Sequence, residues 1–460
     1  MPIKVQLVFE DDAGGPAVVQ EVAQLERDTL APGTLGLTLA EAKTLLQNLQ
    51  SHLVQRQTSA YQQQHQTCPH CQHPRRVKDH RQLVYRSLFG KLHLPSTRFF
   101  HCDCQPHQTK SFSPLADWLT ERTAPELLYL ESKFAALMSY GQSAQLLAEL
   151  FPVDEQINAA TIRNHTRELA ERLEAELGDE QFMFVEGCPR DWAALPRPDM
   201  PLTVGIDGGY VRSSSTQTDQ PRHCFEVITG KSIADDGTLK CFGLVNSYDQ
   251  KPKRRLFELL QSQGMQMNQQ ITFLSDGGDT VRDLQLYLNP QAEHVLDWFH
   301  ITMRITVMKQ MAKSVTYSED ELVEDLDDTI ESIKWYLWHG NVFRALQEIE
   351  LLADGLYREE MSPAQTKLLK KVEEFQTYIT NNQQFITNYG DRYRNGERIA
   401  TGFVESTVNQ VISKRMVKKQ QMRWSQKGAH LLLQVRTRVL DGDWRSTFER
   451  WYPELKSQAA

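Results

Sequence analysis

The chain contains 460 residues, of which 40% are hydrophobic and 24% are charged, as in an ordinary globular protein. This length is too great for one hydrophobic core, so we expect about two to four domains. No apolar run is long enough to span a bilayer, and Met1 does not open a secretory signal, which predicts a cytoplasmic protein with no membrane partner.

Charge is distributed unevenly along the chain. The formal net charge of −8 would by itself argue against a nucleic-acid partner. Residues 392–438 nevertheless carry eleven Lys or Arg against two Glu, whereas residues 319–374 carry fifteen Asp or Glu against six Lys or Arg. Because phosphate contacts depend on local basic surface, the net charge does not exclude DNA. The acidic stretch Glu319–Asp328 could serve as a partner surface or a DNA mimic.

Residues 1–60 are expected to form a strand and helix segment. Ile3–Phe9 alternates like a short strand, and Thr38 with Glu41 forms a capping box ahead of leucines at helical spacing. The Gln-rich stretch Tyr61–Gln66 predicts a linker to the next module.

Residues 61–112 carry two pairs of closely spaced cysteines that flank a predicted β-hairpin at Gly90. Four thiolates from two short knuckles suit tetrahedral Zn²⁺, which would supply folding energy to a segment with little core. We therefore predict a zinc-ribbon-like module whose structural Zn²⁺ is held by Cys68, Cys71, Cys102 and Cys104. Nearby histidines could replace one thiolate, and the alternative is four unliganded cysteines. The odd total of seven cysteines fits metal binding in a reducing compartment better than a disulfide framework.

Residues 113–188 have a helical pattern, with helices expected over 126–139, 143–151 and 159–177. We expect the helical pattern to be interrupted at Tyr140-Gly141, between the first two of these helices. The short break before the third is typical of a helix-turn-helix, in which residues near the start of the second helix face bases. This predicts DNA contacts from Arg163, Asn164 and Arg167. The alternative is a helical packing module with exposed polar residues.

A Pro-rich stretch precedes a region in which strands and helices alternate. Apolar β-branched runs predict the strands, and amphipathic stretches between them predict the helices. The expected order is strands 202–211, 223–233 and 239–248, helix 254–263, strand 270–275, helix 280–288 and strand 294–299. This is the order of a ribonuclease-H-like domain, whose mixed sheet is covered by helices.

We place the first part of that domain at 200–312 and its second part at 391–460. The gap between them is too long for a loop in a compact domain, so we expect a helical insertion over 313–390. The predicted fold class is therefore multidomain α/β, with the zinc-ribbon-like and helix-turn-helix-like modules preceding a ribonuclease-H-like mixed sheet.

Three acidic residues have the sequence settings of a two-metal phosphoryl-transfer site. Asp207 and Asp276 each end an apolar, β-branched run and precede two glycines, so each should emerge near the end of a buried strand. Glu405 opens a helix-like stretch rich in Lys and Arg. Such carboxylates could hold two Mg²⁺ ions roughly 3.5–4 Å apart for in-line displacement at phosphorus. The alternative is that the Asp-Gly-Gly sequences mark turns and that Glu405 caps a helix.

In combination these segments resemble the DDE transposases of bacterial insertion sequences, most closely the ISKra-type family. The likeness extends from Cys68 to about Leu440, and its segments are 204–211, 275–278, 296–301, 404–410, 414–424 and 428–433. It implies Mg²⁺-dependent hydrolysis at element ends, with Mn²⁺ able to substitute, followed by 3′-OH strand transfer into target DNA. It also implies recognition of terminal inverted repeats by the zinc and helical modules, homo-oligomers that bridge two DNA ends, and a location at the nucleoid. The triad would be Asp207, Asp276 and Glu405.

Two further features surround this triad. In related transposases the His of an Asp-x-x-His arrangement lies near the scissile phosphate, which the resemblance suggests for His300 after Asp297. The alternative is a His packed under the sheet. After Glu405, helical spacing predicts a basic face that follows the phosphate backbone, with an aromatic residue stacked on an unpaired base. Its members are Lys414, Arg415, Lys418, Lys419, Arg423 and Trp424, and the alternative is a solvated basic face with a core Trp.

Two other classes of protein remain open. A nuclease of the ribonuclease-H superfamily shares the carboxylates, although small members lack the N-terminal modules and the insertion. A non-catalytic, zinc-dependent DNA-binding protein derived from a transposase would retain the N-terminal modules without activity.

Overall fold

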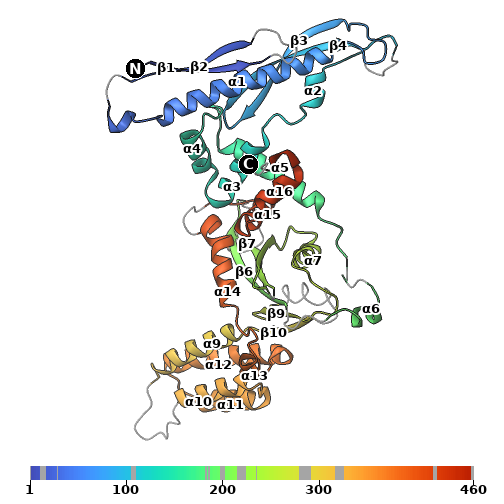
Figure 1. Ribbon diagram of the computed structural model, residues 1–460. Helices are drawn as coiled ribbons and strands as arrows, with labels where there is room; N and C mark the ends of the chain where they lie inside the picture. Colours follow the sequence, from blue (N-terminus) through green and yellow to red (C-terminus); the bar gives the residue numbers. More distant parts are fainter. Residues whose placement is uncertain are drawn as a thin grey trace. The chain divides into compact units, whose positions relative to one another are not determined.

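The computed structural model is a mixed α/β protein that divides into two compact units (Figure 1). One unit comprises Met1–Leu169 with Asp443–Ala460, and the other comprises Ala170–Gly442. The structure describes residues 2–10, 17–27, 30–104, 110–181, 184, 187–196, 202–214, 224–234, 236–278, 292–315, 326–417 and 422–456. The predicted helix 280–288 and two predicted DNA contacts, Lys418 and Lys419, lie outside the described residues.

The first unit begins with an antiparallel hairpin of β1 (Pro2–Phe9) and β2 (Val18–Glu26), followed by η1 (Pro32–Thr34) and the long helix α1 (Leu39–Gln64). The predicted capping box is confirmed. The Thr38 hydroxyl accepts from the Glu41 N–H at 3.3 Å, and the Glu41 carboxylate accepts from the Thr38 N–H at 2.9 Å. The sequence does not predict β2, because its Gln and Glu residues obscure the apolar alternation.

The prediction of a linker over Tyr61–Gln66 is wrong, because α1 continues through Gln64. Glutamine is a good helix former, and one of these glutamines also holds the neighbouring strand. The Gln62 side chain donates to the Pro95 carbonyl at 2.8 Å and accepts from the Thr97 N–H at 2.8 Å. The Gln-rich stretch therefore attaches α1 to the sheet.

A three-stranded antiparallel sheet of β3 (Val77–Ser87), β4 (Gly90–Phe100) and β5 (Ser111–Phe112) lies against α1. The predicted hairpin at Gly90 is confirmed, and Gly90 has a φ of +121°, which favours glycine. A small apolar core joins the sheet to the helices. It consists of Leu83, Leu92, Leu94 and Leu115.

The remaining helices of this unit are α2 (Pro114–Trp118), α3 (Pro125–Leu137), α4 (Tyr140–Leu150), the start of α5 (Ala159–Glu176), α16 (Trp444–Trp451) and η4 (Pro453–Leu455). The predicted break at Tyr140-Gly141 is in fact the first turn of α4, which Ser139 caps. The placement of residues up to 460 with the second sheet also differs from the structure, because α16 packs on α3. The Trp444 indole N–H donates to the Ser132 hydroxyl at 3.1 Å.

The second unit contains a five-stranded mixed sheet in the order β10-β9-β6-β7-β8. The predicted strands are confirmed as β6 (Leu202–Arg212), β7 (Cys224–Ile233), β8 (Leu239–Val245), β9 (Ile271–Ser275) and β10 (Ala292–Leu296). Strand β6 pairs antiparallel with β7 and parallel with β9, and β10 runs parallel to β9. The predicted last strand ends earlier than expected, because Asp297 caps a helix that starts at Trp298.

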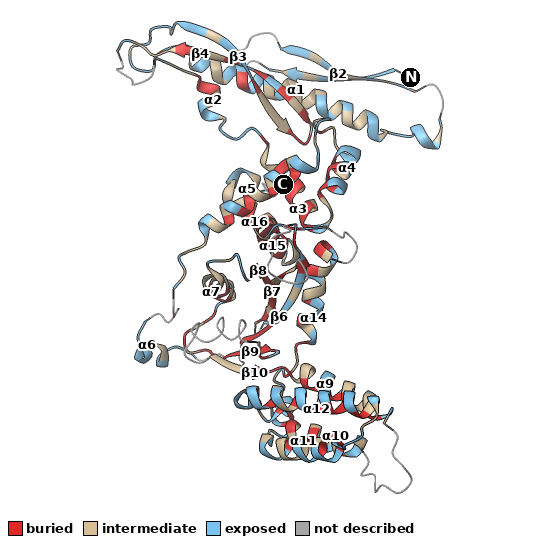
Figure 2. Ribbon diagram, turned by 180° about the vertical axis from the view of Figure 1, so that it is seen from behind, coloured by how far each residue is buried: buried red, intermediate tan, exposed pale blue. Residues whose placement is uncertain are grey.

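Helices cover both faces of this sheet. Apolar side chains of α7 (Pro252–Ser262) share a buried core with alternate residues of β6 and β7, such as Val204 and Ile228. Helices α14 (Gly402–Val408), η3 (Asn409–Val417) and α15 (Gln426–Leu440) pack against β6, β7 and β8. All five residues of β9, which pairs with a neighbouring strand on each side, are buried (Figure 2). The short α6 (Pro189–Ala193) precedes the sheet.

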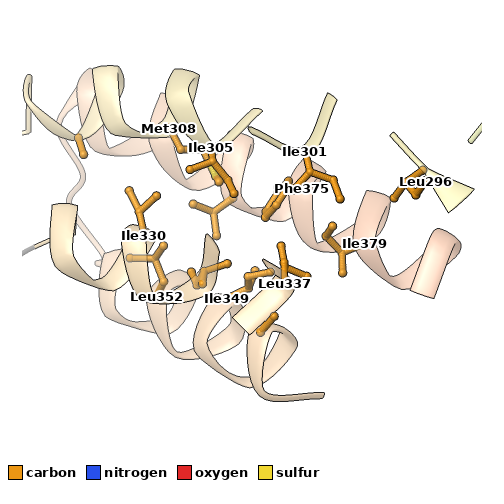
Figure 3. Packing of buried hydrophobic residues seen from close by; sticks show 14 of the residues in the cluster. Leu296, Ile301, Ile305, Met308, Ile330, Leu337, Ile349, Leu352, Phe375 and Ile379 are labelled. Carbon is orange, nitrogen blue, oxygen red and sulfur yellow. The ribbon is translucent and has the colours of Figure 1, made fainter. Parts of the chain in front are cut away.

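A helical insertion connects β10 to α14, as predicted. It consists of α9 (Trp298–Ala312), α10 (Leu326–Trp338), α11 (Val342–Leu356), α12 (Pro363–Asn382), η2 (Gln383–Phe385) and α13 (Tyr389–Arg394). Its helices enclose an apolar core of their own, including Ile305, Leu337, Ile349 and Phe375 (Figure 3). The insertion begins at Trp298, earlier than the predicted 313, and Leu296 of β10 continues the same core.

Candidate functional site

The parallel pairing of β6 with β9 brings two of the predicted carboxylates to one end of the sheet. The paired positions run from Leu202 opposite Ile271 to Gly205 opposite Leu274. Asp207 follows two residues later within β6, and Asp276 follows two residues after Leu274, directly after the end of β9. Because side chains alternate along a strand, Asp207 shares the face of β6 that carries Gly205.

The helix that carries Glu405 lies directly against that face. A Cβ atom added at Gly205 would lie 2.1 Å from Val404 Cγ2, and one at Gly209 would lie 2.9 Å from Ile412 Cδ1. Only glycine therefore allows α14 and η3 to approach β6 this closely. Val404 is fully buried in this contact, whereas Glu405, the next residue, is exposed.

Asp207 is half-buried, and its pKa is shifted by burial and by the charges around it. Burial raises the pKa of Asp207, and the negative charges of Asp276 and Glu405 raise it further. The Gly208 N–H, 2.7 Å from Asp207 Oδ1, and the nearby His300 oppose this shift. Asp207, Asp276, Glu405 and His300 therefore gather in one electrostatic environment, where clustered carboxylates suit a divalent cation.

In the part of the chain that the structure describes, the ligand atoms of the three carboxylates do not all lie within 4.8 Å of one another. Two divalent cations that share a set of carboxylates do not need all three to converge on one point.

Asp297 is a buried carboxylate that joins three elements around the site. Its Oδ1 accepts from the Phe299 N–H at 2.8 Å and from the Thr401 N–H at 3.0 Å, and its Oδ2 accepts from the Thr401 hydroxyl. Its own N–H donates to the Ser275 carbonyl at 2.9 Å, at the end of β9. The side chain thus caps α9 and also holds Thr401, the residue before α14.

Asp297 therefore connects α9, the helix that carries His300, to the residue that precedes α14, the helix that carries Glu405. His300 Nε2 is 3.6 Å from Asp297 Oδ2, and its side chain is 18% exposed. Burial raises the pKa of Asp297, while the Thr401 and Phe299 donors oppose the shift. The sequence grouped Asp297 with His300 but did not predict this capping role, because residue type alone does not distinguish a helix cap at a strand-helix junction from a strand-end or turn residue.

The insertion contributes contacts to the site that the sequence did not predict. The Tyr378 hydroxyl on α12 donates to the Asp276 carbonyl at 3.1 Å, and the Arg304 guanidinium of α9 lies 4.1 Å from the centroid of the Tyr378 ring. Gly277 has a φ of +87°, and a Cβ there would lie 2.3 Å from Asn382 Oδ1. Arg304 is exposed one helical turn after His300. A cation therefore faces solvent beside Asp276, where phosphate would be attracted.

The predicted basic face after Glu405 is wrong for two of its members. Arg415 is fully buried, with its guanidinium 5.1 Å from the Trp424 ring centroid, and Trp424 is 5% exposed. The Trp424 backbone N–H donates to the Arg212 carbonyl at 2.9 Å, which fixes this residue beside the end of β6. Neither side chain is placed to contact phosphate or to stack on a base. Lys414 and Arg423 are exposed, as expected.

The helical geometry explains the error. Residues Asn409–Val417 form a π-helix, so the spacing of an α-helix misplaces the side chains on its surface. The wider turns leave backbone carbonyls that another residue satisfies. The Arg436 guanidinium donates to the carbonyls of Val411, at 2.8 Å, and Gln410. Burial, together with the nearby Arg415 cation, lowers the pKa of Arg436 to about 10.

The four predicted cysteine ligands come together in the first unit. The sulfur of Cys68 lies 3.5 Å from that of Cys104, and the sulfur of Cys71 lies 3.3 Å from that of Cys102. The N–H groups of Cys71 and His70 lower the pKa of Cys68 to about 6, whereas neighbouring sulfurs raise the pKa of Cys104. A set of four such sulfurs could hold a metal ion such as Zn²⁺. Histidine is not needed to complete it.

The predicted base-contacting residues lie on the first half of α5. Arg163 and Asn164 are exposed, and Arg167 is partly exposed. The connection from α4 to α5 covers residues 151–158, which is longer than the three- or four-residue turn of a typical helix-turn-helix. These side chains are accessible to a partner, and their contact with DNA stays a prediction.

A second acidic cluster of the second unit contains Glu174, Asp249 and His430, whose ligand atoms lie within 4.8 Å of one another. Arg255 occupies its centre. The guanidinium donates to Glu174 at 2.9 Å and to Asp249 at 2.9 Å, and also to Gln434 at 2.7 Å. The Arg255 guanidinium thus already balances the negative charges of this cluster. We therefore interpret the cluster as a contact that joins α5, α7 and α15 rather than as a metal site.

Neither protein-family models nor curated protein sequences give a match to this chain. In the described parts of the chain, no helix combines the length and the apolar character needed to cross a membrane.

Proposed function

We propose that this chain is a DDE-type DNA transposase. In this proposal, Asp207, Asp276 and Glu405 hold two Mg²⁺ ions, or Mn²⁺ in their place, for hydrolysis at element ends and strand transfer by the 3′-OH. The observation that carries the proposal is the close approach of α14 to β6, the strand that runs parallel to β9, together with the effect of Asp276, Glu405 and His300 on the pKa of Asp207.

The sheet topology supports the same assignment. Strands β6, β7 and β8 form an antiparallel run, and β9 and β10 add in parallel beside β6. This is the arrangement that we expect of a ribonuclease-H-like domain, in which the helix after the insertion returns the last carboxylate to the first strand. The two N-terminal modules would then recognise the terminal inverted repeats, in a homo-oligomer that bridges two DNA ends.

The chemistry follows from the positions of the side chains. Bound Mg²⁺ would make the attacking oxygen more nucleophilic and would stabilise the departing oxygen. Asp207, whose pKa is raised in part by the charges of Asp276 and Glu405, would hold the metal ions together with these two carboxylates. His300, whose Nε2 lies 3.6 Å from Asp297 Oδ2, would donate a hydrogen bond to a phosphate oxygen or move a proton. Arg304 adds a positive charge beside Tyr378, whose hydroxyl donates to the Asp276 carbonyl.

The test is cleavage of duplexes that carry the sequences flanking the gene, with Mg²⁺ or Mn²⁺. Wild type is compared with Glu405→Gln, which keeps the shape of the side chain and removes the charge that holds the metal. Glu350→Gln, an exposed position on α11, is the matched control. Loss of cleavage with retained DNA binding in Glu405→Gln alone supports the proposal.

Other results would contradict it. Equal cleavage by wild type and Glu405→Gln would remove Glu405 from the site. Tight binding without cleavage by either protein would favour a non-catalytic DNA-binding protein. Cleavage of unrelated DNA without strand transfer would favour a nuclease of the same superfamily.

A further inference from the structure

The sheet of the first unit is rich in Lys and Arg residues that are not among the predicted DNA contacts. Residues 72–112 contain eight Lys or Arg and two Asp, in a chain whose net charge is −8. The first half of β3, which carries several of these cations, is largely exposed (Figure 2). The basic surface is therefore a local feature of this sheet.

Four of the cations gather around one position of the sheet. The Arg76 guanidinium and the Lys78 ammonium lie 5.6 Å and 5.9 Å from the centroid of the Phe100 ring. Lys78 and Arg98 both donate to the Ser111 hydroxyl, at 3.1 Å and 3.0 Å, and Ser111 is paired with Phe100. Arg81 joins them through Asp79, which also accepts from Arg98. We call Arg76, Lys78, Arg81 and Arg98 the basic sheet face.

This face keeps a net positive charge. Asp79 is the carboxylate that contacts it among the described residues, and it is shared between Arg81 and Arg98. The Arg81 side chain is 64% exposed, and its nearest approach to Asp79 is 3.8 Å. An exposed ion pair of this length contributes little, so the guanidinium remains available to another anion.

The backbone beneath these side chains is fixed. A β-bulge between Val77 and Asp79 adds Lys78 to the strand without a paired partner, which turns its side chain toward Phe100. On the other side of the sheet, Arg75 donates to the His65 carbonyl at the end of α1. The Phe100 N–H donates to the Arg76 carbonyl at 2.9 Å. Cations on a rigid sheet lose little conformational entropy on binding.

We infer that the basic sheet face binds the phosphate backbone of duplex DNA beside the four-cysteine site. The choice of DNA rests on the proposed function. Guanidinium groups match phosphate geometry, and the face presents three of them with one ammonium. The Phe100 ring is already covered by Arg76 and Lys78, so the surface offers charge rather than an open ring for stacking. Its contribution is therefore to affinity and orientation, whereas base reading belongs to other residues.

The experiment measures the salt dependence of binding to a fluorescent random-sequence duplex, using the full-length chain. The test variant combines Arg76→Ala, Lys78→Ala and Arg81→Ala. The control combines Lys4→Ala, Arg56→Ala and Arg122→Ala, which removes the same charge from separate positions in the same unit. Each lost phosphate contact lowers the slope of log affinity against log salt by about 0.9, so the test variant should lose about 2 to 3 from the slope. The control should keep the wild-type slope.

Two outcomes would overturn the inference: a wild-type slope in the test variant, or an equal loss of slope in the control. Far-UV circular dichroism and bound zinc verify the fold of each variant. If the triple variant does not fold, the single Arg81→Glu variant still decides, because charge reversal at this exposed position must weaken binding. Metal-dependent cleavage by wild type is measured separately, so a failure of the transposase proposal is distinguishable from a failure of this one.

Discussion

Asp207 lies two residues beyond Gly205, the last residue of β6 that pairs with β9, and Asp276 lies two residues beyond its partner, Leu274. The two carboxylates therefore occupy equivalent positions on neighbouring parallel strands. Helix α14 crosses the same position on Gly205, so one glycine determines how close Glu405 comes to Asp207.

Replacing this glycine should displace α14. In Gly205→Ala, the new methyl group would lie 2.1 Å from Val404 Cγ2, and the helix has to move. We expect a loss of about 1–3 kcal/mol in the free energy of unfolding, measured in urea, together with reduced cleavage. Gly402→Ala, on the same helix with nothing within 4 Å of the added atom, should leave both unchanged. Equal stability of the two variants would mean that the close approach is not needed.

The raised pKa of Asp207 gives a prediction about stability and metal. A carboxyl whose pKa is raised by folding stabilises the fold below its unfolded-state pKa, and this contribution is lost as pH rises through the folded-state pKa. In chelator at neutral pH, Asp207→Asn should therefore have a higher Tm than wild type. Adding Mn²⁺ should raise the Tm of wild type more than that of the variant.

The control for this comparison is Asp354→Asn, an exposed residue of α11. Its Tm should match wild type with and without Mn²⁺. A wild-type Tm that does not respond to Mn²⁺, or responds equally in Asp207→Asn, would argue against metal binding at this carboxylate.

The position of Asp297 predicts a change in activity larger than the change in DNA affinity. Asp297→Ala removes the acceptor for three donors from α9 and from the start of α14, and should cost about 1–3 kcal/mol per group left unsatisfied. Cleavage should fall because His300 and Glu405 lose their common support, while the Kd for DNA changes little. Asn341→Ala removes a comparable cap from α11, away from the site, and should lower stability without lowering cleavage. Similar losses of cleavage in both would indicate a general effect of instability.

The four-cysteine site should bind one zinc ion per chain. Cys71→Ser removes one of its sulfurs and should release the metal, which a colorimetric chelator measures. Because the cysteines connect the segment before β3 with the segment after β4, metal loss should also make this sheet more sensitive to proteolysis. Cys188→Ser changes an exposed cysteine away from the cluster and should retain the metal. Zinc retained in Cys71→Ser would point to other ligands.

The burial of Arg415 predicts a structural role. Arg415→Ala should lower the free energy of unfolding by about 1–2 kcal/mol through the lost contact with Trp424, while the salt dependence of DNA binding stays unchanged. Lys414→Ala, at the exposed neighbouring position, should leave stability unchanged. A reduced salt slope in Arg415→Ala would show that its guanidinium reaches DNA after all.

Much of the second sheet could be predicted from the sequence, because several strong local signals agree in that region. The β-branched runs before Asp207 and Asp276 predict buried strands, and the structure has these strands as β6 and β9. The capping box at Thr38 and the glycine at 90 likewise determine local geometry through their own chemistry. The four cysteines could be grouped because thiolates at such spacing have few other uses.

The remaining features depend on contacts between distant residues. Nothing near Tyr378 in the sequence indicates that its hydroxyl meets the Asp276 carbonyl, 102 positions away. The π-helix after α14 depends on the Arg436 guanidinium to satisfy its carbonyls, so a periodicity of 3.6 misplaced Arg415. The prediction of a linker at Gln62 was wrong for a related reason, because the Gln62 side chain makes hydrogen bonds to Pro95 and Thr97 of β4, which are distant in the sequence.

The helical insertion leaves and rejoins the sheet at a single junction, where the Trp298 N–H donates to the Ile399 carbonyl at 3.1 Å. Because its two ends meet, the length of chain between them can vary without changing the register of β9 and β10. Helices α9 and α12 are constrained, since they carry His300 and the Tyr378 and Asn382 contacts to the Asp276 turn. In the described structure, α10 and α11 make no comparable contact with the Asp276 turn. They pack mainly on each other and on α9 and α12. Evolutionary changes in length, and fusions introduced by engineering, should therefore be tolerated at the exposed α11–α12 connection (residues 357–360) and rejected within α9 or α12.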